Sequence, residues 1–215
     1  MVAVVYGPSM TVRADLTVPG WALVSAVAAP VSMIGGWTLA GSRQQSFDAV
    51  GETISALAAS GATAPWIMSA ALAGTGIAHL VTAAGLRPVP RAARALHALG
   101  GAATVVVAAL RVDVWPRAHG AAAAVGFGAL ALWPACAWRR GHSGVLRPVV
   151  AAGVATSLVG LLALFVVELQ GLTPDSGAAT GLAERALAGA QALWPLVVVV
   201  ALRSGRTDSA RSSAS

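Results

Sequence analysis

Eight side chains that could do acid–base or nucleophilic chemistry fall in three short polar stretches of an otherwise apolar sequence. They are Asp48, Glu52, Ser55, Arg111, Asp113, His119, Glu184 and Arg185. Carboxylates with an imidazole can hold a metal ion, a hydroxyl beside an imidazole can act as a nucleophile, and a mixed polar cluster can bind a small polar ligand or a lipid headgroup. Each chemistry requires the stretches to meet in space, so the segments between them decide which is possible.

The segments between them are long and apolar. The chain has 215 residues, of which 57% are hydrophobic and 10% charged, and its mean hydropathy is +0.75. A helix needs about 20 apolar residues to cross roughly 30 Å of hydrocarbon. Six segments are apolar enough: 21–40, 65–86, 95–110, 118–138, 149–167 and 181–202. The sequence predicts an all-α bundle of six transmembrane helices over residues 19–203, an N-terminal segment 1–18 and a disordered tail 204–215.

Arginine positions predict the topology. All 14 basic residues are arginines, and ten of them fall on one side of the bilayer if the segments alternate in direction. The ten are Arg13, Arg87, Arg91, Arg94, Arg139, Arg140, Arg147, Arg203, Arg206 and Arg211. The positive-inside rule then places both termini in the cytoplasm and the protein in the cytoplasmic membrane. Nucleic-acid binding is not favoured, because no aromatic or motif context accompanies these arginines.

Most carboxylates fall on the opposite, outer side. The outer six are Asp48, Glu52, Asp113, Glu168, Asp175 and Glu184. Residues 46–59 of the first outer loop have helical periodicity, with Asp48, Glu52 and Ser55 on one stripe and four apolar residues opposite. This pattern predicts a short amphipathic helix with Ser46 as its N-cap. An arrangement with the acids toward water is favoured over one that turns them over the mouth of the bundle.

The polar stretches resemble one known family. FDAVGETISALAASGATAPWIM, RVDVWPRAHG and GLAERALAGAQALWP, in this order and spacing, are similar to the domain-of-unknown-function family 998 of six-helix bacterial membrane proteins, over about residues 20–203. The residues that carry the likeness are Ile54, Ser55, Leu57, Asp113, His119, Glu184 and Arg185. The family has no established activity, so the resemblance implies a fold and a place to look, not a reaction.

Ionisable groups at a membrane boundary are costly unless they pair or face a cavity, so the outer residues predict a shared polar site or a charge network. We expect Asp113 to couple to His119 across the turn after the third segment and Arg111 to pair with Asp113. Asp48, Glu52, Ser55, Glu184 and Arg185 would close the site. The first hypothesis is therefore an outward-facing site that binds a small polar ligand or a lipid headgroup.

Two hydrolytic functions stay open. A metal-dependent hydrolase acting on lipid would use the outer carboxylates and His119, but the sequence has no H-E-x-x-H motif. Serine catalysis would use Ser55 with His119, although G-x-S-x-G is absent. No cofactor, oligomeric state or specific ligand is identified by these patterns.

Three non-hydrolytic functions also stay open. Haem ligation would need His79 and His97 at one depth, whereas the segment bounds put them roughly 5 to 8 Å apart along the membrane normal. We expect His79 to hydrogen-bond a neighbouring helix and His97 to lie in the arginine-rich inner interface. Ion- or proton-coupled transport is disfavoured because the acids lie at the rim rather than the midplane. A scaffold would need only packing seams such as Gly120, Ala124 and Gly128.

Overall fold

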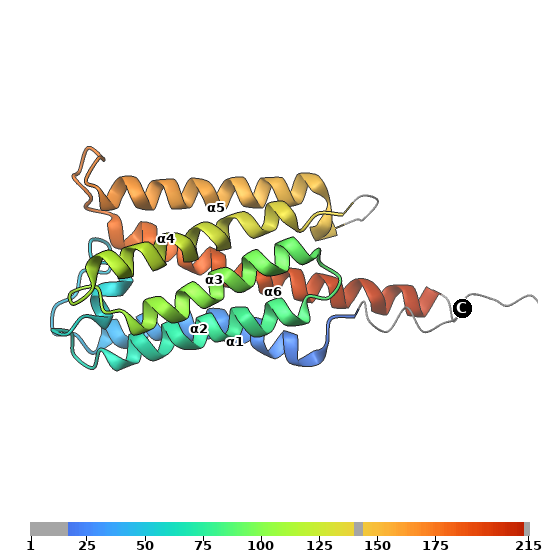
Figure 1. The fold of residues 1–215 in the computed structure, drawn as a ribbon, viewed down its shortest axis with the longest axis horizontal. Helices are drawn as coiled ribbons and strands as arrows, with labels where there is room; N and C mark the ends of the chain where they lie inside the picture. The colour runs from blue at the N-terminus through green and yellow to red at the C-terminus, as the bar shows by residue number, and fades with distance from the viewer. Residues whose placement is uncertain (1–16, 140–143, 213–215) are drawn as a thin grey trace, which may run out of the picture.

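The computed structural model describes residues 17–139 and 144–212, with side chains as far as Ser204. Its six long helices are α1 (Gly20–Ser42), α2 (Trp66–Gly85), α3 (Arg91–Ala109), α4 (Pro116–Leu132), α5 (Pro148–Leu169) and α6 (Thr180–Ser212) (Figure 1). Each is long and apolar enough to cross a membrane, α4 together with the 3-10 helix η4 (Trp133–Cys136) that follows it. The described residues contain no strand. The predicted all-α fold of six transmembrane helices is confirmed, and the chain is a multi-pass membrane protein.

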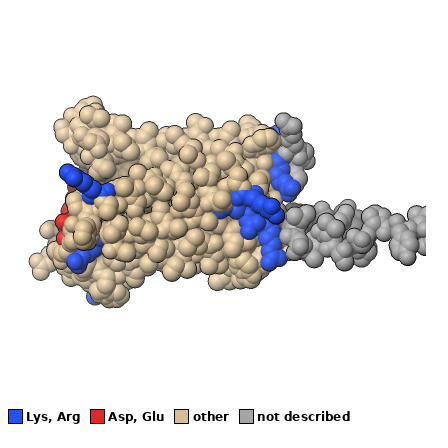
Figure 2. Space-filling view, viewed as in Figure 1, with Lys and Arg blue, Asp and Glu red and all other residues tan. Residues whose placement is uncertain are grey.

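The helices form one antiparallel bundle. Each packs against the next in the sequence, and α6 also packs against α1, which closes the ring. The α1–α2, α3–α4 and α5–α6 connections lie together at one end, which we call the loop end (Figure 1). The described carboxylates, drawn red, gather at the loop end, whereas most of the described arginines lie at the opposite, arginine end (Figure 2). Charge therefore separates along the bundle as the sequence predicts.

Helix α3 begins four residues earlier than its predicted segment, at Arg91. An arginine is accommodated in its first turn because the long side chain of Arg94 reaches polar groups at the end of the neighbouring helix. Arg94 donates from Nε to the carbonyl of Ala83 at 2.8 Å and from Nη2 to that of Ala84 at 3.1 Å. These two carbonyls belong to the last turn of α2, so Arg94 also caps that helix.

Helices α2 and α3 approach each other closely at two glycines. A Cβ on Gly76 would lie 2.6 Å from the carbonyl oxygen of Gly101, and a Cβ on Gly101 would lie 2.7 Å from that of Gly76. By contrast, Gly120 and Gly128 of the predicted α4 seam would meet nothing within 4 Å. The prediction of a seam there is wrong for this chain, because α4 contacts α3 through the face that carries Gly126 instead.

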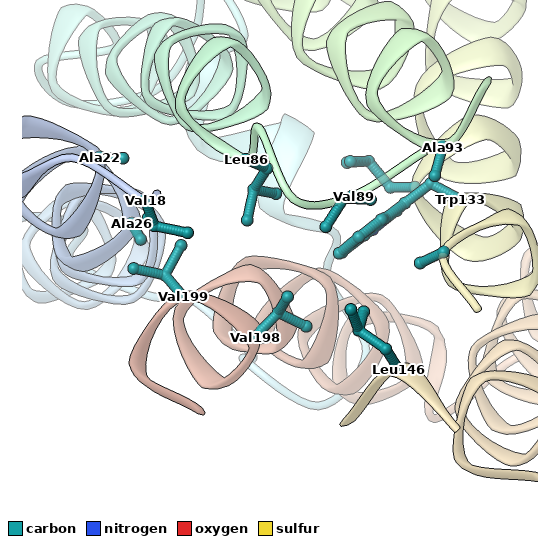
Figure 3. Close-up of a cluster of buried hydrophobic side chains, with 12 residues drawn as sticks. Val18, Ala22, Ala26, Leu86, Val89, Ala93, Trp133, Leu146, Val198 and Val199 are labelled. Carbon is teal, nitrogen blue, oxygen red and sulfur yellow. The ribbon is translucent and has the colours of Figure 1, made fainter. Parts of the chain in front are cut away.

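The arginine end of the bundle is closed by buried apolar side chains. The cluster comprises Val18, Ala22, Ala26, Leu86, Val89, Ala93, Leu130, Trp133, Ala137, Leu146, Val198 and Val199 (Figure 3). Trp133 is the largest of them and has no exposed surface. Such a cluster excludes water and fixes the helices at this end.

The predicted surface helix over residues 46–59 is not confirmed. Only Ile54–Ala58 is helical, as the short 3-10 helix η3. A turn precedes it, because the Glu52 N–H donates to the carbonyl of Asp48 at 2.7 Å and the Val50 N–H donates to Oδ1 of Asp48 at 2.9 Å. Thr53 then adopts an extended conformation and accepts the Ala56 N–H as the cap of η3. The acids face water, as favoured from the sequence, while Ile54 is buried.

Residues 1–16 and 213–215 lie outside the described residues, and α6 is helical to Ser212. The division of the chain into segments 1–18, 19–203 and 204–215 therefore stays a prediction.

Candidate functional site

The α1–α2 loop, residues 43–65, is bonded to the first turns of α6. The Leu182 N–H donates to the carbonyl of Val50 at 2.9 Å, and Nη1 of Arg185 donates to the carbonyl of Glu52 at 2.8 Å. The Ile54 N–H donates to Oε2 of Glu184 at 2.5 Å. Glu184 is only 4% exposed, so a backbone group of the loop supplies the partner that a buried carboxyl group requires.

The same loop is bonded to the α3–α4 turn. Oδ2 of Asp113 accepts the Ser60 N–H at 3.1 Å. Hydrogen bonds from Ser60, with a smaller attraction to Arg111, hold the pKa of the exposed Asp113 carboxyl below its usual value. The loop is therefore held at two sides of the bundle. Its Ile54 bonds Glu184 of α6, and its Ser60 bonds Asp113 of the α3–α4 turn.

A third contact holds the loop, between Ser55 and His119, and these two side chains could also take part in a reaction. Oγ of Ser55 lies 3.0 Å from Nε2 of His119, and Nδ1 of His119 lies 2.6 Å from the carbonyl oxygen of Leu110. A carbonyl oxygen can only accept, so Nδ1 carries the proton. In the neutral imidazole Nε2 is then an acceptor, and the Ser55 hydroxyl donates to it. His119 is buried and held in one orientation by both contacts.

A cavity lies beneath η3, between α1, α2, α3, α4 and α6. The residues around it are Met33, Ile54, Ser55, Leu72, Thr75, His79, Thr104, Val107, Ala123, Gly126, Phe127, Leu130, Glu184, Ala188 and Gln191. Centres of water molecules can occupy about 40 Å³ of it. A single water needs about 10 to 15 Å³ measured in this way, so the cavity can hold several waters or a small polar group.

Gln191 lines this cavity with an unused acceptor. Its Nε2 donates to the carbonyl of Phe127 at 2.9 Å, while its Oε1 is buried without a partner. The side chain is 2% exposed. Buried carbonyl oxygens in folded proteins are almost always hydrogen-bonded, so an unpartnered one beside a cavity indicates a place for a donor.

Two histidines lie on the side of the cavity away from the loop. Nδ1 of His79 and Nε2 of His97 are 3.0 Å apart, and the His97 ring stacks on Trp133 with a centroid distance of 4.8 Å. The expected bond from His79 to a neighbouring helix is confirmed. The predicted depth mismatch and interfacial position of His97 are wrong, because α3 begins at Arg91 and thus carries His97 as deep as His79.

The comparison with known proteins agrees with this description. The model of a family described as protein of unknown function, DUF998, matches residues 26–201. The chain belongs to the DUF998 family. No curated protein and no solved structure matches it.

The DUF998 residues that carried the likeness in the sequence converge on the α1–α2 loop. Ser55, His119 and Glu184 meet at its inner surface, and Asp113 and Arg185 bond its backbone. Asp113 and His119 bind different residues of this loop and not each other. Glu52 accepts the Asp48 N–H at 3.0 Å, and both side chains are exposed. Arg111 is also exposed, and its positive charge helps to lower the pKa of the Asp113 carboxyl.

The buried part of the site was not assigned from the sequence of this DUF998 chain. Thr75, Thr104, His79 and Gln191 all line the cavity. Glu184 and Gln191 are seven residues apart and so share one face of α6, which was the available signal. Nothing in the spacing of the threonines distinguishes them from other small residues of a membrane helix.

Metal ligation finds little support in the described part of this DUF998 protein. No group of three or more His, Cys, Asp or Glu side chains lies close enough together there to hold an ion. The carboxylates of the loop end bond backbone N–H groups instead. A metal-dependent hydrolase would thus need ligands that these side chains do not jointly offer.

Proposed function

We propose that this DUF998 protein binds a small amphipathic molecule, with a hydroxyl or amine group of the ligand seated in the cavity under the α1–α2 loop. The observation that supports it is the unpartnered Oε1 of Gln191. Leaving a buried polar atom without a partner costs about 1 to 3 kcal/mol. A ligand that donates a hydrogen bond to this oxygen recovers that free energy, whereas a purely apolar ligand does not.

The rest of the cavity indicates the kind of ligand. Ser55 and Glu184 offer further polar atoms, while Met33, Leu72 and Val107 form apolar walls. This mixture suits a polar group attached to a hydrocarbon body, as in the headgroup region of a lipid. A glycerol headgroup has donating hydroxyls and is small enough to test the idea, either free or as part of a lipid.

The experiment measures thermal stabilisation of the purified protein in detergent by 1-monooleoylglycerol and, separately, by glycerol. We expect monooleoylglycerol to stabilise the wild type and Gln170→Leu, which makes the same change at an exposed position after α5. Gln191→Leu should remove the stabilisation. A response to glycerol alone at similar concentration would identify a free polyol as the ligand. If neither compound stabilises the wild type, or if Gln191→Leu responds equally, the proposal is wrong.

The far side of the cavity supports binding rather than transport. The polar lining ends at His79, and its hydrogen-bond partner His97 stacks on Trp133. Beyond Trp133 lies the buried apolar cluster of the arginine end (Figure 3). A coupled transporter needs a polar path to both sides of the membrane in some state, and this packing blocks one side.

We also propose that the arginine end faces the cytoplasm and the loop end the outside of the cytoplasmic membrane, since arginines are retained on the cytoplasmic side. In a Cys136→Ala background, Ser60→Cys should react with an impermeant maleimide in intact cells. Arg87→Cys should react only after the cells are opened. The reverse pattern would show the opposite orientation.

A further inference from the structure

We propose that Ser55 is a nucleophile and His119 its general base, and that the protein hydrolyses a carboxylic ester of a lipid whose head occupies the cavity. This inference rests on the proposed binding function and adds a reaction to it. It starts from the three-part contact of Ser55 Oγ, His119 and the Leu110 carbonyl, at 3.0 and 2.6 Å. A nucleophile bonded to a base that a third group orients is the arrangement used in serine catalysis.

The hydrogen bonds of His119 decide which atom of the Ser55–His119 pair donates and which accepts. Because the Leu110 carbonyl accepts a hydrogen bond from the Nδ1–H of His119, the free lone pair of Nε2 points at the Ser55 hydroxyl. A serine that only tied down the loop could equally bond a backbone carbonyl, as Ser157 does toward Gly153 on α5. A basic nitrogen as acceptor instead allows the serine oxygen to lose its proton as it attacks.

The location of Ser55 gives the pair a substrate site. Ser55 lies on η3 in the roof of the cavity, and Glu184 and Gln191 line the same space. A polar head that donates to Gln191 would bring its ester bond into the volume that Ser55 borders. The cavity is large enough for water, which the second half of the reaction consumes.

The reaction balances with water as the only co-substrate. Oγ of Ser55 bonds to the ester carbonyl carbon while its proton moves to Nε2 of His119. The bond from that carbon to the alcohol oxygen then breaks, and His119 returns the proton to the leaving alcohol. Water attacks the acyl-serine in the same way, giving its proton to His119, and the carboxylic acid leaves as the Ser55 hydroxyl is restored.

The test uses the full-length protein in detergent. A fluorophosphonate probe should attach covalently to the wild type, and peptide mass spectrometry should place the adduct on Ser55. Release of oleate from 1-monooleoylglycerol should fall by at least about 100-fold in Ser55→Ala and in His119→Asn, because general-base assistance contributes at least that much. Ser46→Ala changes an exposed serine of the same loop and should keep both signals.

Binding and catalysis can fail separately in this design. If monooleoylglycerol stabilises the wild type but the probe labels no residue, or labels one other than Ser55, the catalytic inference is wrong and the binding function stands. Release of oleate by Ser55→Ala at the wild-type rate would also overturn it. Because the adduct is mapped on the wild type, the result does not depend on either variant folding.

Discussion

The hydrogen bond between Glu184 and the Ile54 N–H should determine how often the α1–α2 loop opens. We consider Glu184→Leu, which keeps a side chain of similar bulk but removes the acceptor. The bond is 2.5 Å long and the side chain 4% exposed, so the N–H would lose its partner in a buried setting. That loss costs about 1 to 3 kcal/mol. Since about 1.4 kcal/mol corresponds to a factor of ten, the open population of the loop should rise about 5- to 150-fold.

Amide hydrogen exchange measures this opening directly. In lipid nanodiscs, the peptide that contains Ile54 should exchange faster in Glu184→Leu by the factor given above, while the centres of α2 and α3 keep their protection. Glu184→Gln retains an amide oxygen that can accept the same N–H, so its exchange should stay within a few fold of the wild type. Glu52→Gln is the matched control, because Glu52 is exposed.

Two results would refute this reasoning. Unchanged exchange at Ile54 in Glu184→Leu would mean that the other ties hold the loop without help from Glu184. An equal loss of protection along α2 and α3 would mean that Glu184 supports the whole bundle rather than the loop.

Three further predictions concern packing and pH. His79→Leu and His97→Leu should each lower the unfolding temperature, because each leaves a ring nitrogen of the other histidine without a partner, which costs about 1 to 3 kcal/mol. The double variant should be destabilised by less than the sum of the two single variants, because it leaves neither nitrogen behind. Gly76→Ala should destabilise the bundle by crowding the α3 backbone, whereas Gly120→Ala, with open space around it, should be neutral or stabilising by up to about 1 kcal/mol in the same thermal assay. Because the pKa of Asp113 is lowered in the folded protein, its contribution is present above the usual pKa of 3.8 and is lost as the pH falls through the lower folded value. Loop exchange at Ser60, corrected for its intrinsic pH dependence, should therefore lose protection in that acidic range in the wild type but not in Asp113→Ala.

The helices were predictable because the bilayer sets their length and composition. The segment predicted over 149–167 is α5 over Pro148–Leu169, and that over 21–40 is α1 over Gly20–Ser42. The largest displacement of a helix start is at α3, where arginines that a hydropathy pattern excludes belong to the first helical turn. Because the predicted start is four residues late, the prediction placed His97 about 6 Å too close to the inner boundary. That error concealed its pairing with His79.

The α1–α2 loop was less predictable because tertiary contacts decide its structure. Of the four apolar residues on one face of the helical wheel, Ile54 and Leu57 are buried, whereas Phe47 is half-buried and Val50 is 48% exposed, because the backbone between Asp48 and Thr53 turns instead of continuing as helix. The Ile54 N–H bonds Glu184 on α6, 130 residues away in the sequence. A periodicity calculation over residues 46–59 contains no information about such a partner.

Ligand binding and loop opening should be linked, because Ile54 and Ser55 both hold the loop and line the cavity. A ligand that donates to Gln191 leaves both ties intact and binds only while the loop is closed. At 100 times its dissociation constant it would then stabilise the closed state by about 2.7 kcal/mol, which is roughly 100-fold slower exchange at Ile54. A ligand that instead displaced the Ile54 N–H from Glu184 would speed this exchange. Saturating 1-O-oleylglycerol, an ether analogue without an ester bond to hydrolyse, should therefore slow exchange in the wild type and leave Gln191→Leu unchanged, and faster exchange would identify Glu184, not Gln191, as the group that holds the ligand.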